Sequence, residues 1–223
     1  MQNIVITGTS QGIGLELVKI ALEEGHKVLA IARPSTHLQD LKSLVDQNLA
    51  NLHILEVDLR DQDAQGKIAA ATDSWDKIDV LINNAGIYRP DETVENFLDT
   101  FETNTVIPFF LTKSLLEKLK KSSHPKAVFI SSLMGSITDN TSGGSHSYRA
   151  SKAALNMIVK GLSEEEKKIG FLLLHPGWVK TNMGGDQAPV SPEDSARGLW
   201  KQIGDTKEGA LQYLDYQGKS LPW

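Results

Sequence analysis

The chain has 223 residues, of which 40% are hydrophobic, enough to build the core of one large α/β domain or two small ones. Its formal net charge of −5 gives no support for nucleic acid or an anionic membrane surface as a partner. Cysteine is absent, which excludes disulfides and thiolate chemistry and favours a reducing, cytoplasmic location.

Metal binding and membrane insertion are not expected either. The six histidines are scattered without metal-ligand spacing. The first predicted strand begins at residue 3, which leaves no room for a signal peptide. No apolar stretch is long enough to span a bilayer.

Predicted strands and helices alternate along the chain. Apolar, β-branched runs predict strands at 3–6, 27–32, 53–57, 78–82, 127–131, 171–174 and 210–214. Helices are predicted at 15–24, 35–48, 62–75, 93–121 and 149–168, and from Ser191, an N-cap followed by Pro192. Pro108 marks a kink or junction in the longest helix. This alternation predicts a parallel sheet covered on both faces, in one domain spanning 1–223.

The first predicted strand leads directly into a glycine-rich turn and then a helix. Gly8, Gly12 and Gly14 are spaced differently from the usual dinucleotide fingerprint, and no P-loop lysine follows. Glycines let the backbone approach a pyrophosphate, and the helix N-terminus meets its negative charge. The turn therefore predicts a dinucleotide site, with a glycine-rich connection that binds nothing as the alternative.

Tyr148 and Lys152 are four residues apart, so they share one face of a helix. At ~5 Å and an effective dielectric of ~20, the ammonium favours the phenolate by roughly 3 kcal/mol, about two pKa units. We therefore expect the Tyr148 pKa to be lowered towards neutral pH, where a phenol exchanges protons. Taken alone, the pair also fits an ordinary amphipathic helix.

Further motifs are Asp58, the run 83–86, Asn104, the run 130–132 and Pro176-Gly177. Together with the glycine turn and the Tyr148–Lys152 pair, they resemble the short-chain dehydrogenase/reductase family over essentially the whole chain. The resemblance implies a doubly wound, Rossmann-type parallel sheet and the compact single-domain branch. The segments 174–181 and 216–223 are similar, more narrowly, to Sniffer-like carbonyl reductases and bacterial C-factor proteins.

The resemblance implies a catalytic tetrad, listed in chain order as Asn104, Ser132, Tyr148 and Lys152. Tyr148 would give a proton to a carbonyl oxygen as hydride arrives from a nicotinamide, and Ser132 would hydrogen-bond that oxygen. Lys152 would bind the nicotinamide ribose, and Asn104 would hold a water for proton resupply. Ser131 competes with Ser132 on sequence alone, but the family places the catalytic serine second.

The end of the second predicted strand indicates which dinucleotide is bound. It has no acidic residue to bind the ribose hydroxyls of NAD, and it has Arg33. A guanidinium there can pair with the 2′-phosphate of NADP, so we predict NADP(H), with a solvent-facing arginine as the alternative. Asp58 would contact the adenine or, alternatively, cap the next helix. The cofactor-binding residues that the resemblance implies are Gly8, Thr9, Ser10, Gly12, Ile13, Gly14, Arg33, Asp58, Leu59, Asn84, Ala85, Gly86, Tyr148, Lys152, Pro176, Gly177, Val179 and Thr181.

The predicted function is an NADP(H)-dependent oxidoreductase that acts on a small carbonyl or alcohol substrate. A dinucleotide-binding signalling protein of C-factor type, acting through protein contacts, is the alternative. The substrate pocket should be lined by the loop 133–147 and by residues such as Trp178 and Met183. A homodimer or homotetramer is the expected assembly.

Overall fold

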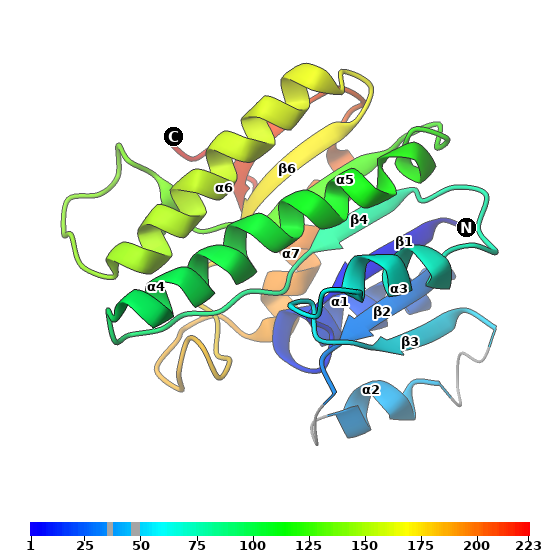
Figure 1. Cartoon of the computed structure of the whole chain (residues 1–223), viewed down its shortest axis with the longest axis horizontal. Helices are drawn as coiled ribbons and strands as arrows, with labels where there is room; N and C mark the ends of the chain where they lie inside the picture. Colours follow the sequence, from blue (N-terminus) through cyan, green and yellow to red (C-terminus); the bar gives the residue numbers. More distant parts are fainter. Residues whose placement is uncertain (35–37, 46–49) are drawn as a thin grey trace.

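The computed structural model describes residues 1–34, 38–45 and 50–223. These residues form a seven-stranded parallel sheet in the order β3-β2-β1-β4-β5-β6-β7 (Figure 1). The strands are β1 (Asn3–Thr7), β2 (Lys27–Ala32), β3 (Leu52–Glu56), β4 (Val80–Asn83), β5 (Lys126–Ile130), β6 (Gly170–His175) and β7 (Leu211–Asp215). The strand order reverses between β1 and β4, which places a topological switch point at the centre of the sheet.

Helices cover both faces of this sheet. They are α1 (Gly12–Glu23), α2 (Gln39–Ser43), α3 (Ala64–Ala71), α4 (Val94–Phe101), α5 (Ile107–Leu119), α6 (His146–Glu165) and α7 (Pro192–Asp205). A π-helical segment, η2 (Glu102–Val106), joins α4 to α5, and a 3₁₀ turn, η3 (Leu133–Gly135), follows β5. The expected doubly wound parallel sheet is confirmed.

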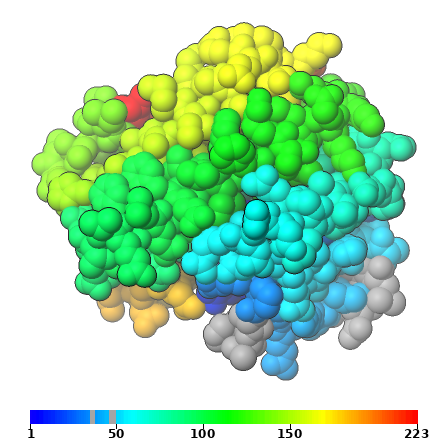
Figure 2. Space-filling model, in the orientation of Figure 1, coloured from blue at the N-terminus to red at the C-terminus, as the bar shows by residue number. Residues whose placement is uncertain are grey.

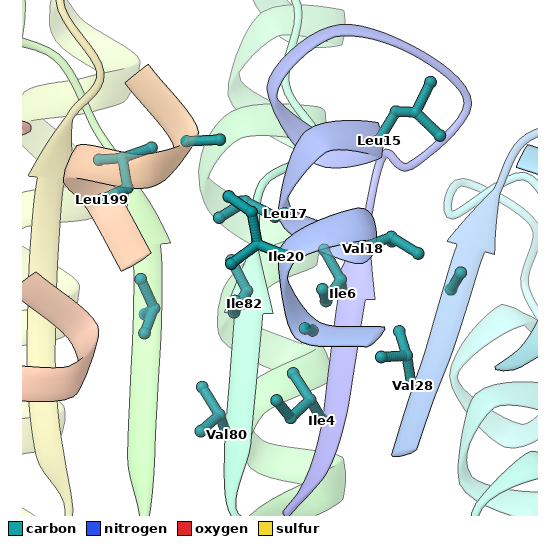
Figure 3. Packing of buried hydrophobic residues seen from close by; sticks show 14 of the residues in the cluster. Ile4, Ile6, Leu15, Leu17, Val18, Ile20, Val28, Val80, Ile82 and Leu199 are labelled. Carbon is teal, nitrogen blue, oxygen red and sulfur yellow. The ribbon is translucent and has the colours of Figure 1, made fainter. Parts of the chain in front are cut away.

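Two hydrophobic cores lie on opposite faces of the sheet because successive strand residues point to opposite sides. On one face α1, α2 and α7 form one hydrophobic cluster with strand side chains such as Ile4 and Ile6, and Figure 3 shows α1 over these two residues with Leu199 of α7 to one side. On the other face α3, α5 and α6 cover side chains such as Val5 and Leu81. In the space-filling view of Figure 2, α4 and α5 lie at the surface beside α3.

Several predicted boundaries shift in the structure. The long predicted helix 93–121 is two α-helices joined by η2, and Pro108 lies in the first turn of α5. The predicted helix 35–48 extends at both ends over residues outside the described ones, with α2 between them. The Ser191 cap is confirmed, since its hydroxyl accepts from the Asp194 amide at 3.0 Å. No helix in the described residues is both long and apolar enough to cross a membrane.

Candidate active site

A cavity of about 350 Å³ lies at the carboxyl ends of the strands, beside the switch point between β1 and β4. Parallel sheets bind their ligands at this place. Its walls come from the segments that follow β1, β2, β3, β4 and β6, and from α6. The predicted dinucleotide turn and the Tyr148–Lys152 pair therefore meet in one cavity.

The glycine turn is shaped by backbone that other residues do not fit. Gly8 and Gly12 have φ of 70° and 58°, in the left-handed region. A Cβ on Gly14 would lie 2.1 Å from the Gly8 carbonyl oxygen. The N-cap residue of α1, Gln11, makes no side-chain cap, so its side chain does not satisfy the first-turn amides of that helix. This arrangement suits a bound anion.

The segment after β4 holds the glycine turn in place. The Asn84 Nδ2 donates to the carbonyl oxygens of Thr7 at 2.9 Å and Gly8 at 3.0 Å. In return, the Thr7 hydroxyl accepts from the backbone amides of Asn84 and Ala85, both at 3.0 Å. Two turns that are distant in sequence are thus joined into one rigid wall of the cavity.

Tyr148 and Lys152 line the other end of the cavity, both from α6. Lys152 is only 4% exposed, and its ammonium donates to the Ile130 carbonyl oxygen at 2.8 Å. The Lys152 Nζ lies 5.7 Å from the centroid of the Tyr148 ring. The expected juxtaposition of phenol and ammonium is therefore present.

The two side chains titrate differently from the sequence-based expectation. Burial raises the pKa of Tyr148 to about 12, and a hydrogen bond with Ser132 partly opposes the rise. Burial also lowers the pKa of Lys152 to about 8. The expected lowering of the Tyr148 pKa is therefore wrong for this structure, because the cost of burying a phenolate outweighs the attraction of an ammonium directed at Ile130.

The structure separates the roles of the two candidate serines. Ser131 borders the cavity, but its hydroxyl is buried and donates to the Asn156 Oδ1 at 2.7 Å. The Ser132 hydroxyl accepts from the Met134 amide at 3.2 Å, and Ser132 opposes the rise in the Tyr148 pKa. Of the two serines, Ser132 is therefore the one that acts on Tyr148.

Asn104 lies in η2 behind the cavity rather than in its wall. Its Oδ1 accepts from the Ile87 amide at 2.8 Å, and its Nδ2 donates to the Ile87 carbonyl at 2.9 Å and to the Ser151 hydroxyl at 3.2 Å. A Cβ on Gly86 would lie 3.2 Å from the Asn104 Oδ1 and 3.6 Å from the Lys152 Nζ. Asn104 thus fastens the segment after β4 against α6, close to Lys152.

At the opposite rim, Arg33 and Asp58 both line the cavity. Asp58 accepts from Arg60 at 2.9 and 3.2 Å, which holds the pKa of the Asp58 carboxyl below its usual value, and Arg33 adds a smaller lowering. The alternative role of Asp58 as a helix cap is wrong, because α3 has Asp63 at its N-cap. Arg33 is exposed and makes no ion pair with any residue that the structure describes.

The comparisons with known proteins agree with this geometry. The family model described as short chain dehydrogenase matches residues 2–190. The chain belongs to this family. It is therefore an oxidoreductase by family, and its compact branch is the one predicted from the motifs.

Three relatives of the chain are informative. A carbonyl reductase from Pseudomonas aeruginosa PAO1 aligns with a TM-score of 0.91 and 36% identity over 100% of both chains. Another structure of that carbonyl reductase, in complex with NADP, aligns with a TM-score of 0.88 and 35% identity over 100% of both chains. The carbonyl reductase Sniffer of D. melanogaster gives a TM-score of 0.91 and 35% identity over 100% of both chains. The C-signal of Myxococcus xanthus is 40% identical over 154 residues, which are 66% of this chain and 93% of that protein.

Most, but not all, of the residues expected from sequence border the cavity. Those that do are Gly8, Ser10, Gly12, Ile13, Gly14, Arg33, Asp58, Leu59, Asn84, Ala85, Gly86, Tyr148, Lys152, Pro176 and Thr181. Those that do not are Thr9, Asn104, Ser132, Gly177 and Val179. Thr9 is fully buried, and its hydroxyl donates to the Ile31 carbonyl at 3.1 Å. Its side chain therefore supports the turn from behind.

Of the two residues expected beside the substrate, Met183 and Trp178, one borders the cavity and the other does not. Met183 lines the cavity. Trp178 does not, and its indole N–H donates to the Gly184 carbonyl at 2.7 Å. Tyr88, which the sequence did not single out, packs edge-on against Tyr148 with ring centroids 5.4 Å apart.

A charged rim was also missed from sequence. Arg89 donates to the Asp99 carboxylate at 3.0 and 3.1 Å, and Arg60 reaches the same carboxylate at 3.3 Å. Together with Asp58, these residues form a continuous chain of ion pairs along the cavity. No sequence spacing links them, because they come from three different segments. No group of acidic or histidine side chains among the described residues could hold a metal ion.

Proposed function

We propose that the chain is an NADP(H)-dependent carbonyl reductase, or alcohol dehydrogenase in reverse, with Tyr148 as the general acid/base. The observation that carries the proposal is the single cavity that runs from the glycine turn and Arg33 to Tyr148 and Lys152. A dinucleotide needs an anion site at one end and a reacting site at the other. Carbonyl reductases of known structure, one of them in complex with NADP, support the same reading.

The residues at the anion end fit NADP(H). Gly8 and Gly14 let the turn pack closely against the segment after β4, at the N-terminus of α1, where the first-turn amides suit a pyrophosphate. Arg33 follows β2, where an NAD-selective site has an acidic side chain, and its guanidinium, which makes no ion pair with the described residues, would pair with a 2′-phosphate. When bound, the cofactor supplies or accepts the hydride.

At the reacting end, the side chains of the protein handle the proton and the oxygen. With its pKa raised to about 12, Tyr148 keeps its proton at neutral pH, so it is ready to give that proton to a carbonyl oxygen. The Ser132 hydroxyl would hydrogen-bond the same oxygen as negative charge develops on it. Lys152, with a pKa of about 8, is mainly protonated at pH 7 and would bind the ribose hydroxyls. A protonated Tyr148 favours reduction over oxidation at neutral pH.

The test is turnover by the Tyr148→Phe variant. NADPH oxidation is followed with a panel of quinones, aldehydes and ketones, and NADPH binding is measured separately by fluorescence. We expect the wild type to consume at least one substrate and the variant to lose ~10²–10⁴-fold in kcat while binding NADPH normally. A variant that turns over as fast as the wild type would exclude Tyr148 as the acid.

A signalling protein is the alternative function, because C-signal is 40% identical over most of its own length. A protein that only binds the dinucleotide would bind NADPH and oxidise none of the panel. Tight NADPH binding without any turnover would therefore favour this alternative over the reductase.

A further inference from the structure

A buried polar network surrounds the Ser132 carbonyl oxygen. The Tyr213 hydroxyl, from β7, donates to the Ser132 carbonyl oxygen, which also accepts from the Gly135 amide at 2.8 Å. Ser131 and Asn156 bond each other next to this point, and both also interact with the Tyr213 hydroxyl. Tyr213 is 4% exposed, so its hydroxyl has no water to replace these partners.

The C-terminal residues extend this network to the other end of the same loop. The Trp223 ring packs on the Tyr213 ring with centroids 5.6 Å apart. The Trp223 carbonyl oxygen accepts from the Thr138 amide at 3.1 Å and from the Thr138 hydroxyl at 2.8 Å. The segment from Ser132 to Thr138 is therefore fastened at both ends to β7 and the residues that follow it.

We propose that Tyr213 is a positioning residue that aims the Ser132 hydroxyl at the substrate oxygen by holding the Ser132 carbonyl. The proposal rests on the proposed function, in which Ser132 hydrogen-bonds that oxygen. Ser132 has extended backbone, with φ −156° and ψ 148°, and its hydroxyl accepts from the Met134 amide two residues along the chain. The bond from Tyr213 to the Ser132 carbonyl restricts rotation about ψ of Ser132, and it thereby fixes the position of the Met134 amide that orients the Ser132 hydroxyl.

A double-mutant cycle tests whether Tyr213 acts through Ser132. Tyr213→Phe, Ser132→Ala and the double variant are assayed for kcat and KM with NADPH and the best substrate of the panel. We expect Tyr213→Phe to lower kcat about 10-fold, as for one lost hydrogen bond, and to leave NADPH affinity unchanged. In the Ser132→Ala background, Tyr213→Phe should lower kcat less than about 2-fold, because the Ser132 hydroxyl that Tyr213 positions is absent.

Tyr216→Phe is the matched control. It is the same substitution three residues away, and among the described residues the Tyr216 hydroxyl has a single hydrogen-bond partner, the Gln217 side chain, from which it accepts. We expect its kcat to equal that of the wild type. If Tyr213→Phe fails to fold by circular dichroism, Trp223→Leu replaces it in the cycle, since it removes the ring that supports Tyr213.

Different outcomes contradict the proposed function and the positioning role of Tyr213. A wild type that turns over no substrate contradicts the proposed function. The positioning role alone is overturned if the wild type is active and Tyr213→Phe leaves kcat unchanged. It is also overturned if Tyr213→Phe lowers kcat by the same factor in the wild-type and Ser132→Ala backgrounds.

Discussion

At the scale of single residues, stability and function oppose each other most clearly at Lys152. Its ammonium is almost fully buried, and its one hydrogen bond in the structure goes to a neutral carbonyl. No carboxylate among the described residues pairs with it, so burial lowers its pKa to about 8. Folding therefore weakens proton binding at a residue that the proposed mechanism needs in its charged form.

Replacing Lys152 by Met should stabilise the protein at neutral pH while removing activity. Between pH 8 and 10.5 the unfolded lysine holds its proton and the folded one has lost it, so wild-type stability rises with pH there. We expect Lys152→Met to raise the free energy of unfolding by about 1–3 kcal/mol at pH 7, and by much less at pH 10. Urea denaturation at pH 7 and pH 10 checks this prediction. An equal change in the free energy of unfolding at the two pH values would contradict it.

Arg33 should decide between the two nicotinamide dinucleotides. Its guanidinium has no ion-pair partner among the described residues and borders the cavity, and a charge-assisted bond to phosphate contributes ~1.5–3 kcal/mol. We expect Arg33→Ala to weaken NADPH binding roughly 10- to 150-fold and to leave NADH binding almost unchanged. Fluorescence titration at two salt concentrations gives the ratio of NADPH affinity to NADH affinity. Equal weakening of both cofactors would show that Arg33 is not the selector.

At the scale of elements, the sequence predicts best where local chemistry decides. Residues 27–32 were predicted as a strand and form β2 with those bounds, and Ser191 caps α7 as expected. The π segment was not predicted, because a 3.6-residue pattern does not reveal one extra residue per turn. The start of α6 was also missed. It was predicted at Arg149 and lies at His146, directly after Ser145, whose φ is 48°.

The candidate site shows the same division. The glycine turn and the Tyr148–Lys152 pair are local motifs, so their spacing is legible in the sequence. The ion-pair chain through Asp99 is not legible in the sequence. Its members come from the segment after β3, the segment after β4, and α4, and they meet only once these three parts have packed together. The raised pKa of Tyr148 was missed for a related reason: desolvation depends on tertiary burial, which charge spacing does not report.

The join between β1 and α1 should tolerate no side chain at Gly14. A Cβ there meets the Gly8 carbonyl at 2.1 Å and the Asn84 amide nitrogen at 2.6 Å. We expect Gly14→Ala to lower the free energy of unfolding by about 1–3 kcal/mol and to weaken NADPH binding. Gly66→Ala is the matched control, since nothing lies within 4 Å of its added methyl in α3. It should stabilise by about 0.5–1 kcal/mol, and equal thermal unfolding of both variants would contradict the steric argument.

At the scale of the whole molecule, one apolar stripe is left open. Val94 is 78% exposed, Leu98 65%, Val106 44% and Phe110 49%, and all four lie along α4, η2 and α5. These helices lie on the surface shown in Figure 2. Apolar side chains that gather in a line on a surface mark a site of association.

We expect two copies of the chain to associate through this stripe. Sedimentation at micromolar concentration should give twice the 24.4 kDa chain mass for the wild type, and Phe110→Lys should shift it to one chain. Ile137→Lys is the control, because Ile137 is 80% exposed but lies outside these helices. A monomeric wild type, or a Phe110→Lys dimer, would contradict association through this face.

The bond that joins the glycine turn to the segment after β4 also constrains how the chain folds. Thr7 and Asn84 are 77 positions apart, and closing a loop of that length costs roughly 4 kcal/mol of chain entropy before any contact forms. Neither turn has its partner until β4 has docked on β1, so the wall of the cavity forms late. Long-range parallel pairings are intrinsically slow to form. The molecule therefore becomes able to hold a dinucleotide only once this contact between the two turns is made.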